Sequence, residues 1–234
     1  MEYNPQQGWE YESHPNFCMV EKKCNQILTS MSDFEKEQAD YLGDTRPMHR
    51  LMFCDVTPKS CDYFAGNYRG ENYQYLVNYN VSIGGFLGVD AELVDDVMKE
   101  FSSQLAKVID EYESKISELD LSENEKLLTY VELIAYFFAK FLVIHPYANG
   151  NGHMARLLVW VLLKQKGLHQ EFWAVSERPG VPKGVPLDEC IHYFRLGKVE
   201  PLIAYFLLGI LHSKPVTKED LCTHLGINTL ESIQ

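Results

Sequence analysis

Two strongly apolar segments of the chain are joined by the stretch His145-Pro146-Tyr147-Ala148-Asn149-Gly150-Asn151-Gly152-His153-Met154-Ala155-Arg156. A connector between two helices needs little more than one glycine and a polar residue. These twelve residues hold two histidines, two asparagines, two glycines, a proline and an arginine. Pro146 ends the preceding helix and biases the residue before it toward an extended or bridge conformation. We therefore expect His145 to leave the helix with its imidazole pointing into the cleft that the turn lines.

The second half of the stretch has the features of an anion site. Gly150 and Gly152 allow successive backbone N–H groups to turn to one side, and the next helix presents its positive N-terminus there. Arg156 lies one turn into that helix, where its guanidinium could bind the same anion. A histidine beside such a site could accept a proton from a hydroxyl, which predicts nucleotidyl or phosphoryl transfer. The alternative is structural: His145 caps a helix, the glycines form a tight turn and Arg156 pairs with an acid.

Outward from this turn the chain is mainly helical. Apolar residues at helical spacing predict helices over 26–41, 48–53, 91–116, 122–144, 154–166, 187–196 and 201–212, with Ser122 and Glu125 forming a capping box. Residues 215–231 follow the pattern of a helix, a glycine turn and the start of a second helix, which indicates part of a helix-turn-helix or a plain helical hairpin.

One segment between residues 62 and 87 has a strand pattern instead. The alternating apolar residues predict a β-hairpin with its bend at 77–80, and they are Tyr73, Tyr75, Val77, Tyr79, Val81 and Ile83. The predicted fold class is therefore mainly α with a short β-hairpin.

Composition excludes several classes of protein. With 234 residues, 46% of them apolar, the chain can bury a core, and its net charge of −12 repels a nucleic-acid backbone. Its longest apolar stretches, 134–144 and 201–211, are shorter than the roughly 18 residues of a membrane span. No basic end followed by an apolar block opens the chain. We expect a cytoplasmic protein with no membrane partner, which would bind nucleic acid only if the C-terminal segment completes a winged helix.

The central stretch resembles the signature of the Fic (filamentation induced by cyclic AMP), or Fic-Doc, family, H-P-F-x-D/E-G-N-G-R-x-x-R. The His, Pro, Gly, Asn, Gly and last Arg coincide in register, and Tyr147 takes the place of the Phe that anchors the turn in the core. The likeness extends over residues 46 to 212 and includes His49-Arg50 and Gly66-Asn67-Tyr68-Arg69. It implies a helical Fic core over 46–213, an N-terminal extension and helix over 1–45, and a partial helix-turn-helix-like segment over 214–234.

The resemblance also implies an activity: transfer of AMP from ATP to a Ser, Thr or Tyr hydroxyl of a target protein, with Mg²⁺ as cofactor. His145 would be the general base, and Arg156 would bind the outer phosphate. The other nucleotide-binding positions would be Asn149, Gly150, Asn151, Gly152 and His153. The hairpin residues Tyr73, Tyr75, Val77, Tyr79 and Val81 resemble the flap that holds a target segment by main-chain pairing. Self-modification and a homodimer stay open.

Two positions depart from the family pattern. Asn149 stands where the family has the Asp or Glu that holds Mg²⁺, and a neutral amide oxygen is a weak ligand for this ion. His153 replaces the first Arg and carries little charge at neutral pH. Three alternatives follow: slow transfer with the metal held by other oxygens, a different phosphate-bearing donor, or a regulatory module that only binds a nucleotide. The first 60 residues contain no clean copy of the family's inhibitory motif, S/T-x-x-x-E-G/N.

Overall fold

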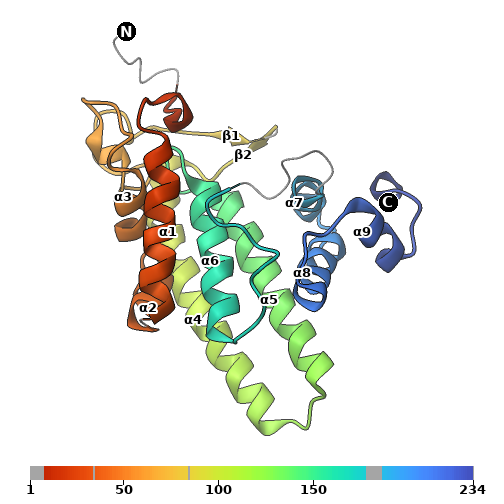
Figure 1. Ribbon diagram of the computed structural model, residues 1–234. Helices are drawn as coiled ribbons and strands as arrows, with labels where there is room; N and C mark the ends of the chain where they lie inside the picture. The colour runs from red at the N-terminus through yellow and green to blue at the C-terminus, as the bar shows by residue number, and fades with distance from the viewer. Residues whose placement is uncertain (1–7, 34, 84, 178–185, 234) are drawn as a thin grey trace. The chain divides into compact units, whose positions relative to one another are not determined.

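The computed structural model describes residues 8–33, 35–83, 85–177 and 186–233 (Figure 1). Within these ranges the protein is mainly helical, with one antiparallel pair of short strands. This confirms the predicted fold class. The α-helices are α1 (Cys18–Asp33), α2 (Glu35–Gly43), α3 (Arg46–Phe53), α4 (Val94–Glu118), α5 (Glu123–Ile144), α6 (Asn151–Gln165), α7 (Leu187–Arg195), α8 (Glu200–His212) and α9 (Lys218–Leu225). The strands are β1 (Ser82–Ile83) and β2 (Phe86–Leu87).

The chain divides into two compact units. The first combines residues 1–106 with 141–155, and the second combines 107–140 with 156–234. Three long helices, α4, α5 and α6, each contribute one part to the first unit and one part to the second.

The first unit is built around α1 and the ends of the long helices. Helix α1 contacts both α2 and α3, and its buried residues Val20, Ile27 and Met31 recur at helical spacing. The Tyr41 hydroxyl of α2 donates a hydrogen bond to the carbonyl of Met154 at 2.6 Å, which joins α2 to the start of α6. This unit contains the turn after α5, from His145 to Ala155.

The second unit is held by aromatic and apolar packing. The hydroxyl of Tyr130 in α5 donates to the carbonyl of Leu162 in α6 at 2.8 Å. The Tyr130 ring packs against that of Tyr112 in α4, with 5.0 Å between ring centroids. Lys166 pairs with Glu113 and lies over both tyrosine rings. Helix α8 contacts α7 and α9.

Most predicted helices form close to their expected positions. The capping box at the start of α5 is present, because Ser122 N–H donates to Glu125 and Glu125 N–H donates to the Ser122 hydroxyl. The helix predicted over 26–41 is wrong in its extent. Two helices, α1 and α2, stand in its place, and α1 begins at Cys18 because its amphipathic pattern already starts at Val20 and Cys24, both of them buried.

The hairpin lies further along the chain than predicted. Ser82 pairs with Leu87 and Ile83 with Phe86, so the paired strands lie beyond the bend predicted at 77–80. Residues 73–79 form turns, with Leu76 N–H bonded to Tyr73 O and Tyr79 N–H bonded to Leu76 O. Local turn hydrogen bonds therefore outweigh the strand preference of the alternating tyrosines.

The C-terminal segment contains the predicted helix and turn. Thr217 and Asp220 form a capping box at the start of α9, and Gly226 ends the helix in the left-handed conformation with φ 67°. The expected second helix is only a short 3-10 turn at Leu230–Ser232 among the residues described.

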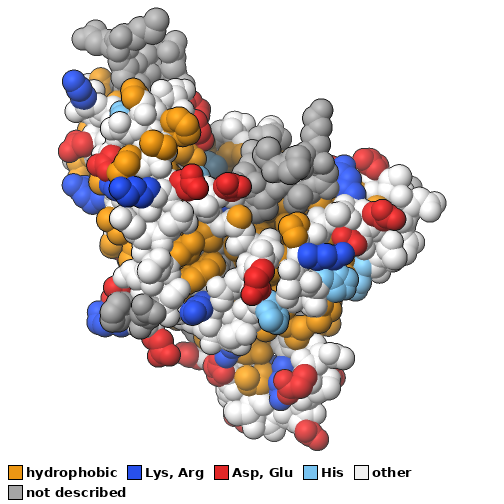
Figure 2. Space-filling view, in the orientation of Figure 1, with side chains coloured by type: hydrophobic (Ala, Val, Ile, Leu, Met, Phe, Trp, Pro, Cys, Tyr) orange, Lys and Arg blue, Asp and Glu red, His pale blue; other side chains and the backbone are white. Residues whose placement is uncertain are grey.

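Helix α5 is the one described helix that is long and apolar enough to cross a membrane by length and composition. It has 22 residues, and its most apolar window has a mean hydropathy of 1.9. More than half of that window, 56%, is buried inside the protein, as expected also of a central core helix. On the face shown in Figure 2, basic side chains are interspersed with acidic ones and do not form one patch.

Candidate active site

His145 lies at the C-terminal exit of α5 in a conformation that the sequence did not predict. Its φ is 53°, in the left-handed region, and not extended or bridge. Its N–H still donates to Phe141 O at 2.9 Å, so the helix continues to this residue before the chain reverses. Non-glycine residues rarely adopt this conformation, which costs roughly 1–2 kcal/mol. Surrounding interactions must therefore hold the turn in place.

The main restraint on this turn is the buried side chain of Arg69, which is 0% exposed. Its Nε donates to the carbonyl of His145 at 2.7 Å and its Nη2 to that of Ile144 at 3.0 Å. Its Nη1 donates to Tyr79 O at 2.7 Å and its Nη2 to Val89 O at 2.9 Å. One guanidinium thus joins the exit of α5 to both ends of the segment that carries the hairpin.

The charge of Arg69 is retained despite its burial. Burial lowers the pKa of the guanidinium to about 10, so it stays protonated at neutral pH. Its backbone N–H also donates to Pro146 O at 2.8 Å. In the sequence this arginine stands out only through the family resemblance, because no pattern around Tyr68 and Gly70 separates a buried side chain from a surface one.

The side chain of Asn151 is hydrogen-bonded to the backbone of the turn. Its side-chain oxygen accepts a hydrogen bond from Tyr147 N–H, and its side-chain nitrogen donates to Tyr147 O, both at 2.9 Å. The Asn151 side chain therefore shapes the turn, and only its main-chain N–H is left for the predicted phosphate contact. The first-turn amides of α6, which begins at Asn151, have no acceptor within the helix.

Tyr147 anchors the turn in the core, as predicted. Its ring stacks on that of His49, with 3.7 Å between centroids and 6° between planes. Its hydroxyl shares a 2.5 Å hydrogen bond with Thr45 Oγ1, which also contacts the Tyr68 hydroxyl at 3.3 Å. Burial raises the pKa of Tyr147 well above its ordinary value.

His49 is hydrogen-bonded to the turn through one defined tautomer. Gly66 N–H donates to its Nδ1 at 2.9 Å, so its Nε2 carries the proton and donates to Asn149 O at 2.9 Å. Space is tight here: a Cβ on Gly150 would lie 2.5 Å from the Phe53 ring, and Gly150 has φ 80°. Only glycine fits this position without strain.

The stability of the protein should fall in acid because of His49. Burial lowers its pKa to about 3 from an ordinary 6.5. Between these two values the unfolded chain binds a proton that the folded chain excludes. This contribution to stability is therefore complete above about pH 6.5 and is lost at about 1.4 kcal/mol per pH unit as the pH falls toward 3. Urea unfolding at pH 7, 6 and 5 measures it.

The matched control for this measurement is His49→Gln. Glutamine keeps one donor and one acceptor but does not titrate, so the variant should show a shallower loss of stability with falling pH. Equal pH dependence in the two proteins would contradict the assignment to His49.

Asn149 uses its side chain for contacts within the protein. Its Nδ2 donates to Trp9 O at 2.7 Å, and its Oδ1 accepts from Gly150 N–H at 2.6 Å. The described residues include no group of three or more His, Cys, Asp or Glu side chains that could hold a metal ion. A neutral amide engaged in this way does not fit the Mg²⁺-binding position that the family resemblance implies.

The remaining predicted phosphate-binding side chains are found in different units. His153 is buried in the first unit, with Nδ1 3.5 Å from the Tyr11 hydroxyl. Arg156 belongs to the second unit, where its Nε donates to Val175 O at 3.0 Å and its carbonyl accepts from the Trp173 indole at 2.9 Å. The first unit thus brings together His145 and residues 149–153. The hydrogen bonds of Arg156 to Val175 and Trp173 lie in the second unit.

The predicted flap residues have mixed roles. Tyr73 stacks on Tyr63, with ring centroids 4.7 Å apart, and Tyr79 is held by Arg69. Val77 is exposed, whereas Tyr75 and Val81 are half-buried. None of these five lies in a strand. Leu87 in β2 is 83% exposed.

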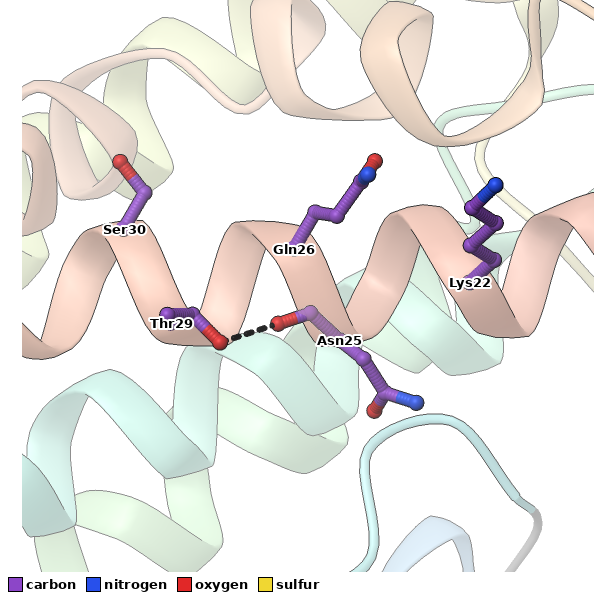
Figure 3. A pocket seen from close by; sticks show the side chains of 5 residues that line it. All are labelled: Lys22, Asn25, Gln26, Thr29 and Ser30. Carbon is purple, nitrogen blue, oxygen red and sulfur yellow. Dashed lines mark hydrogen bonds between the residues drawn. The ribbon is translucent and has the colours of Figure 1, made fainter.

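A separate surface hollow lies along α1. It is lined by Lys22, Asn25, Gln26, Thr29 and Ser30 (Figure 3). These side chains come from one helix, and the Thr29 hydroxyl donates to the carbonyl of Asn25 at 2.9 Å. Lys22 is the one titratable side chain in this lining, and neither a histidine nor a carboxylate accompanies it there. We place the candidate active site at the turn after α5.

The fold and this turn define a helical domain in which His145 follows the end of α5 and a short turn leads to the N-terminus of the buried helix α6 at Asn151. The Fic/DOC family matches residues 44–163, and the chain belongs to this family. A comparison with curated proteins gives no match. Family membership implies a domain for nucleotidyl or phosphate transfer, which binds a nucleotide and acts on a protein target, and whose relatives typically use Mg²⁺.

Proposed function

We propose that this protein transfers AMP from ATP to a Ser, Thr or Tyr hydroxyl of a target protein. The observation that carries the proposal is the frame around His145. Its carbonyl is bonded to the buried Arg69, while its own side chain is half-buried, next in sequence to the turn that opens α6. A frame of this kind fixes a general base relative to a helix N-terminus, which is a favourable place for phosphate.

In the proposed reaction the target hydroxyl attacks the α-phosphorus of ATP. The new O–P bond forms as the bond from the α-phosphorus to the β-bridging oxygen breaks, and diphosphate leaves. His145 accepts the hydroxyl proton on its imidazole. The first-turn amides of α6 balance the negative charge of the phosphates. No step is assigned to Mg²⁺, because Asn149 does not fit it.

The β1–β2 hairpin is the segment that we propose to hold the target. An extended peptide can add to an exposed strand edge by main-chain hydrogen bonds. The strands are Ser82–Ile83 and Phe86–Leu87, so we assign the flap to these strands and not to 73–81. The guanidinium of Arg69 ties both ends of this segment to the exit of α5, which would keep a bound target hydroxyl close to His145.

Labelled ATP tests the proposal directly. The protein is incubated with cell lysate, Mg²⁺ and ATP labelled on the α-phosphate, and separately on the γ-phosphate. Covalent label from the α-phosphate alone is expected. Label from the γ-phosphate alone would mean phosphoryl transfer and would overturn the assignment of AMP as the transferred group.

Replacement of Asn149 by Asp should raise the initial rate of labelling at least about tenfold in the presence of Mg²⁺. A carboxylate is a far better ligand for Mg²⁺ than an amide, and a well-placed metal is worth several kcal/mol in such reactions. The measurement is the rate of α-label incorporation with Mg²⁺ and with EDTA. An unchanged rate would contradict the prediction.

The matched control is Asn149→Ser, which removes the amide donor to Trp9 without adding a charge. If the serine variant is accelerated as much as the aspartate variant, release of Trp9 explains the gain and the metal does not.

A second candidate function is a regulatory module that binds a nucleotide without transferring any part of it. Asn149 replaces the carboxylate that binds the metal in the family, and its amide is already hydrogen-bonded to Trp9 O. Both features favour this candidate. Binding of ATP by calorimetry with no label incorporated from either phosphate would identify it.

A further inference from the structure

Helices α1 and α3 lie side by side in the first unit (Figure 1). Where they meet, Lys23 of α1 contacts the two residues that follow α3, Cys54 and Asp55. None of these three residues belongs to the turn after α5. They bring together an amine, a thiol and a carboxylate that the proposed reaction does not use.

The amine and the thiol are in direct contact. Lys23 Nζ donates a hydrogen bond to Cys54 Sγ at 3.0 Å and pairs with Asp55 Oδ2 at 2.5 Å. The same sulfur lies 3.7 Å from Asp55 Oδ1 and 4.0 Å from the carbonyl of Leu51. Of these groups the lysine nitrogen is the nearest to the sulfur.

The lysine is held in place, whereas the sulfur is open to solvent. The side chain of Lys23 is 13% exposed. Although partial burial lowers the pKa of Lys23, its hydrogen bonds to Asp55 and Cys54 raise it above the ordinary value, so the amine is an ammonium at neutral pH. Cys54 is one of two exposed cysteines in the chain, and the other is Cys18. A small oxidant in solution can therefore reach the sulfur of Cys54.

A thiol with an ammonium beside it is well placed to react with a peroxide. The thiolate is the reacting form of cysteine, and a neighbouring positive charge stabilises it. The first product of oxidation is a sulfenic acid, which condenses with a nearby nitrogen to give a sulfenamide. The nitrogen that such a condensation needs is Lys23 Nζ, already 3.0 Å from the sulfur.

We propose that hydrogen peroxide joins Lys23 to Cys54 by a reversible sulfenamide crosslink between Nζ and Sγ. In the first step the thiolate attacks the peroxide: the S–O bond forms, the O–O bond breaks, and the leaving hydroxide takes a proton from the Lys23 ammonium and departs as water. The sulfur loses two electrons, and the peroxide gains them. In the second step the neutral amine attacks the sulfur of the sulfenic acid. The S–N bond forms, the S–O bond breaks, and the oxygen leaves with one amine proton as a second water.

The crosslink would join α1 to the end of α3 across 31 positions of the chain. Covalent closure of such a loop restricts the unfolded chain, which stabilises the folded unit. Phe53, next to Cys54, packs against His49 with 4.7 Å between ring centroids. The crosslink would thus fix the helix that carries this buried histidine. The inference does not depend on AMP transfer.

Peptide mass spectrometry of the full chain tests the crosslink. The reduced protein is treated under native conditions with a small excess of hydrogen peroxide and then digested. The expected product joins the Lys23 and Cys54 peptides with the loss of two hydrogens, and fragment ions place the link on Lys23 and not on the adjacent Cys24. Dithiothreitol should reverse it. The thermal unfolding midpoint should rise by at least about 5 °C on oxidation and return on reduction.

Three variants separate the roles of the two side chains. Lys23→Arg keeps a positive charge beside the sulfur, but a protonated guanidinium is a poor nucleophile, so Cys54 should stop at the sulfenic acid, which dimedone traps. Cys54→Ser should give neither product. Lys22→Arg is the matched control, because Lys22 is the exposed neighbour of Lys23 on α1, and this variant should crosslink like the parent.

Two results would overturn the inference. One is oxidation of Cys54 to a sulfinic acid, or to a disulfide between two copies of the chain, with no link to Lys23. The other is an undiminished crosslink in the Lys23→Arg variant, which would assign the bond to a different nitrogen or sulfur. Neither result bears on the labelling experiments with ATP, and a failure of those experiments leaves the crosslink untouched.

Discussion

Replacing His145 with alanine is expected to lower the rate of AMP transfer by about 10²- to 10⁴-fold, the usual contribution of a general base. The backbone interactions that shape the turn, from Phe141 O and from Arg69 to His145, do not involve the imidazole and are kept in the variant. ATP affinity should therefore change little. Initial rates of α-label incorporation and calorimetric titration with ATP measure the two quantities separately.

His145→Asn serves as the matched control for this substitution. Alanine is strained at the φ of 53° that the turn requires, whereas asparagine tolerates left-handed backbone better. The asparagine variant should thus be as inactive as the alanine variant and closer to the parent in stability. A His145→Ala protein that labels its target as fast as the parent would show that another group removes the proton.

The largest expected effect on stability comes from Arg69→Met. The substitution keeps the approximate length and packing of the side chain but leaves four carbonyl groups without their donor. Because a buried acceptor left unpaired costs about 1–3 kcal/mol, the free energy of unfolding should drop by at least roughly 3–5 kcal/mol. Urea unfolding at pH 7 measures the loss.

Two further variants sharpen this experiment. Arg69→Lys should be nearly as unstable, since one ammonium cannot reach carbonyls placed around a planar guanidinium. Arg50→Met removes the charge from an exposed arginine on α3 and should change stability by no more than about 0.5 kcal/mol. A loss of less than about 1 kcal/mol for Arg69→Met would mean that the carbonyls find other partners.

Local sequence patterns predicted the helices and the turn well. The start of α5 follows from the Ser122–Glu125 capping box, and the strongly apolar spacing of α4 and α8 places those helices within a few residues. The anchoring of Tyr147 in the core also followed from the motif. These features depend on neighbours within a few positions along the chain, which is why the residues themselves are sufficient to predict them.

The hairpin shows where local patterns mislead. Alternating tyrosines predicted strands over 73–83, yet Tyr73 stacks on Tyr63 and Tyr79 O is taken by Arg69. Tyr63 and Arg69 both lie outside the segment 73–83, so the periodicity of that segment cannot indicate these contacts. The paired strands are instead β1 and β2, where Ser82 pairs with Leu87 and Ile83 with Phe86.

The family, the mainly helical class and the candidate base could all be predicted from the residues alone, because the motif from His145 to Arg156 is a contiguous string. The folded structure was needed to see that Arg69 holds this turn, that His49 is neutral, and that Asn149 is bonded to Trp9. Each of these three residues makes a hydrogen bond to a residue more than 70 positions away in the chain. Such pairings are set by how the core packs, so no local stretch of residues reveals them.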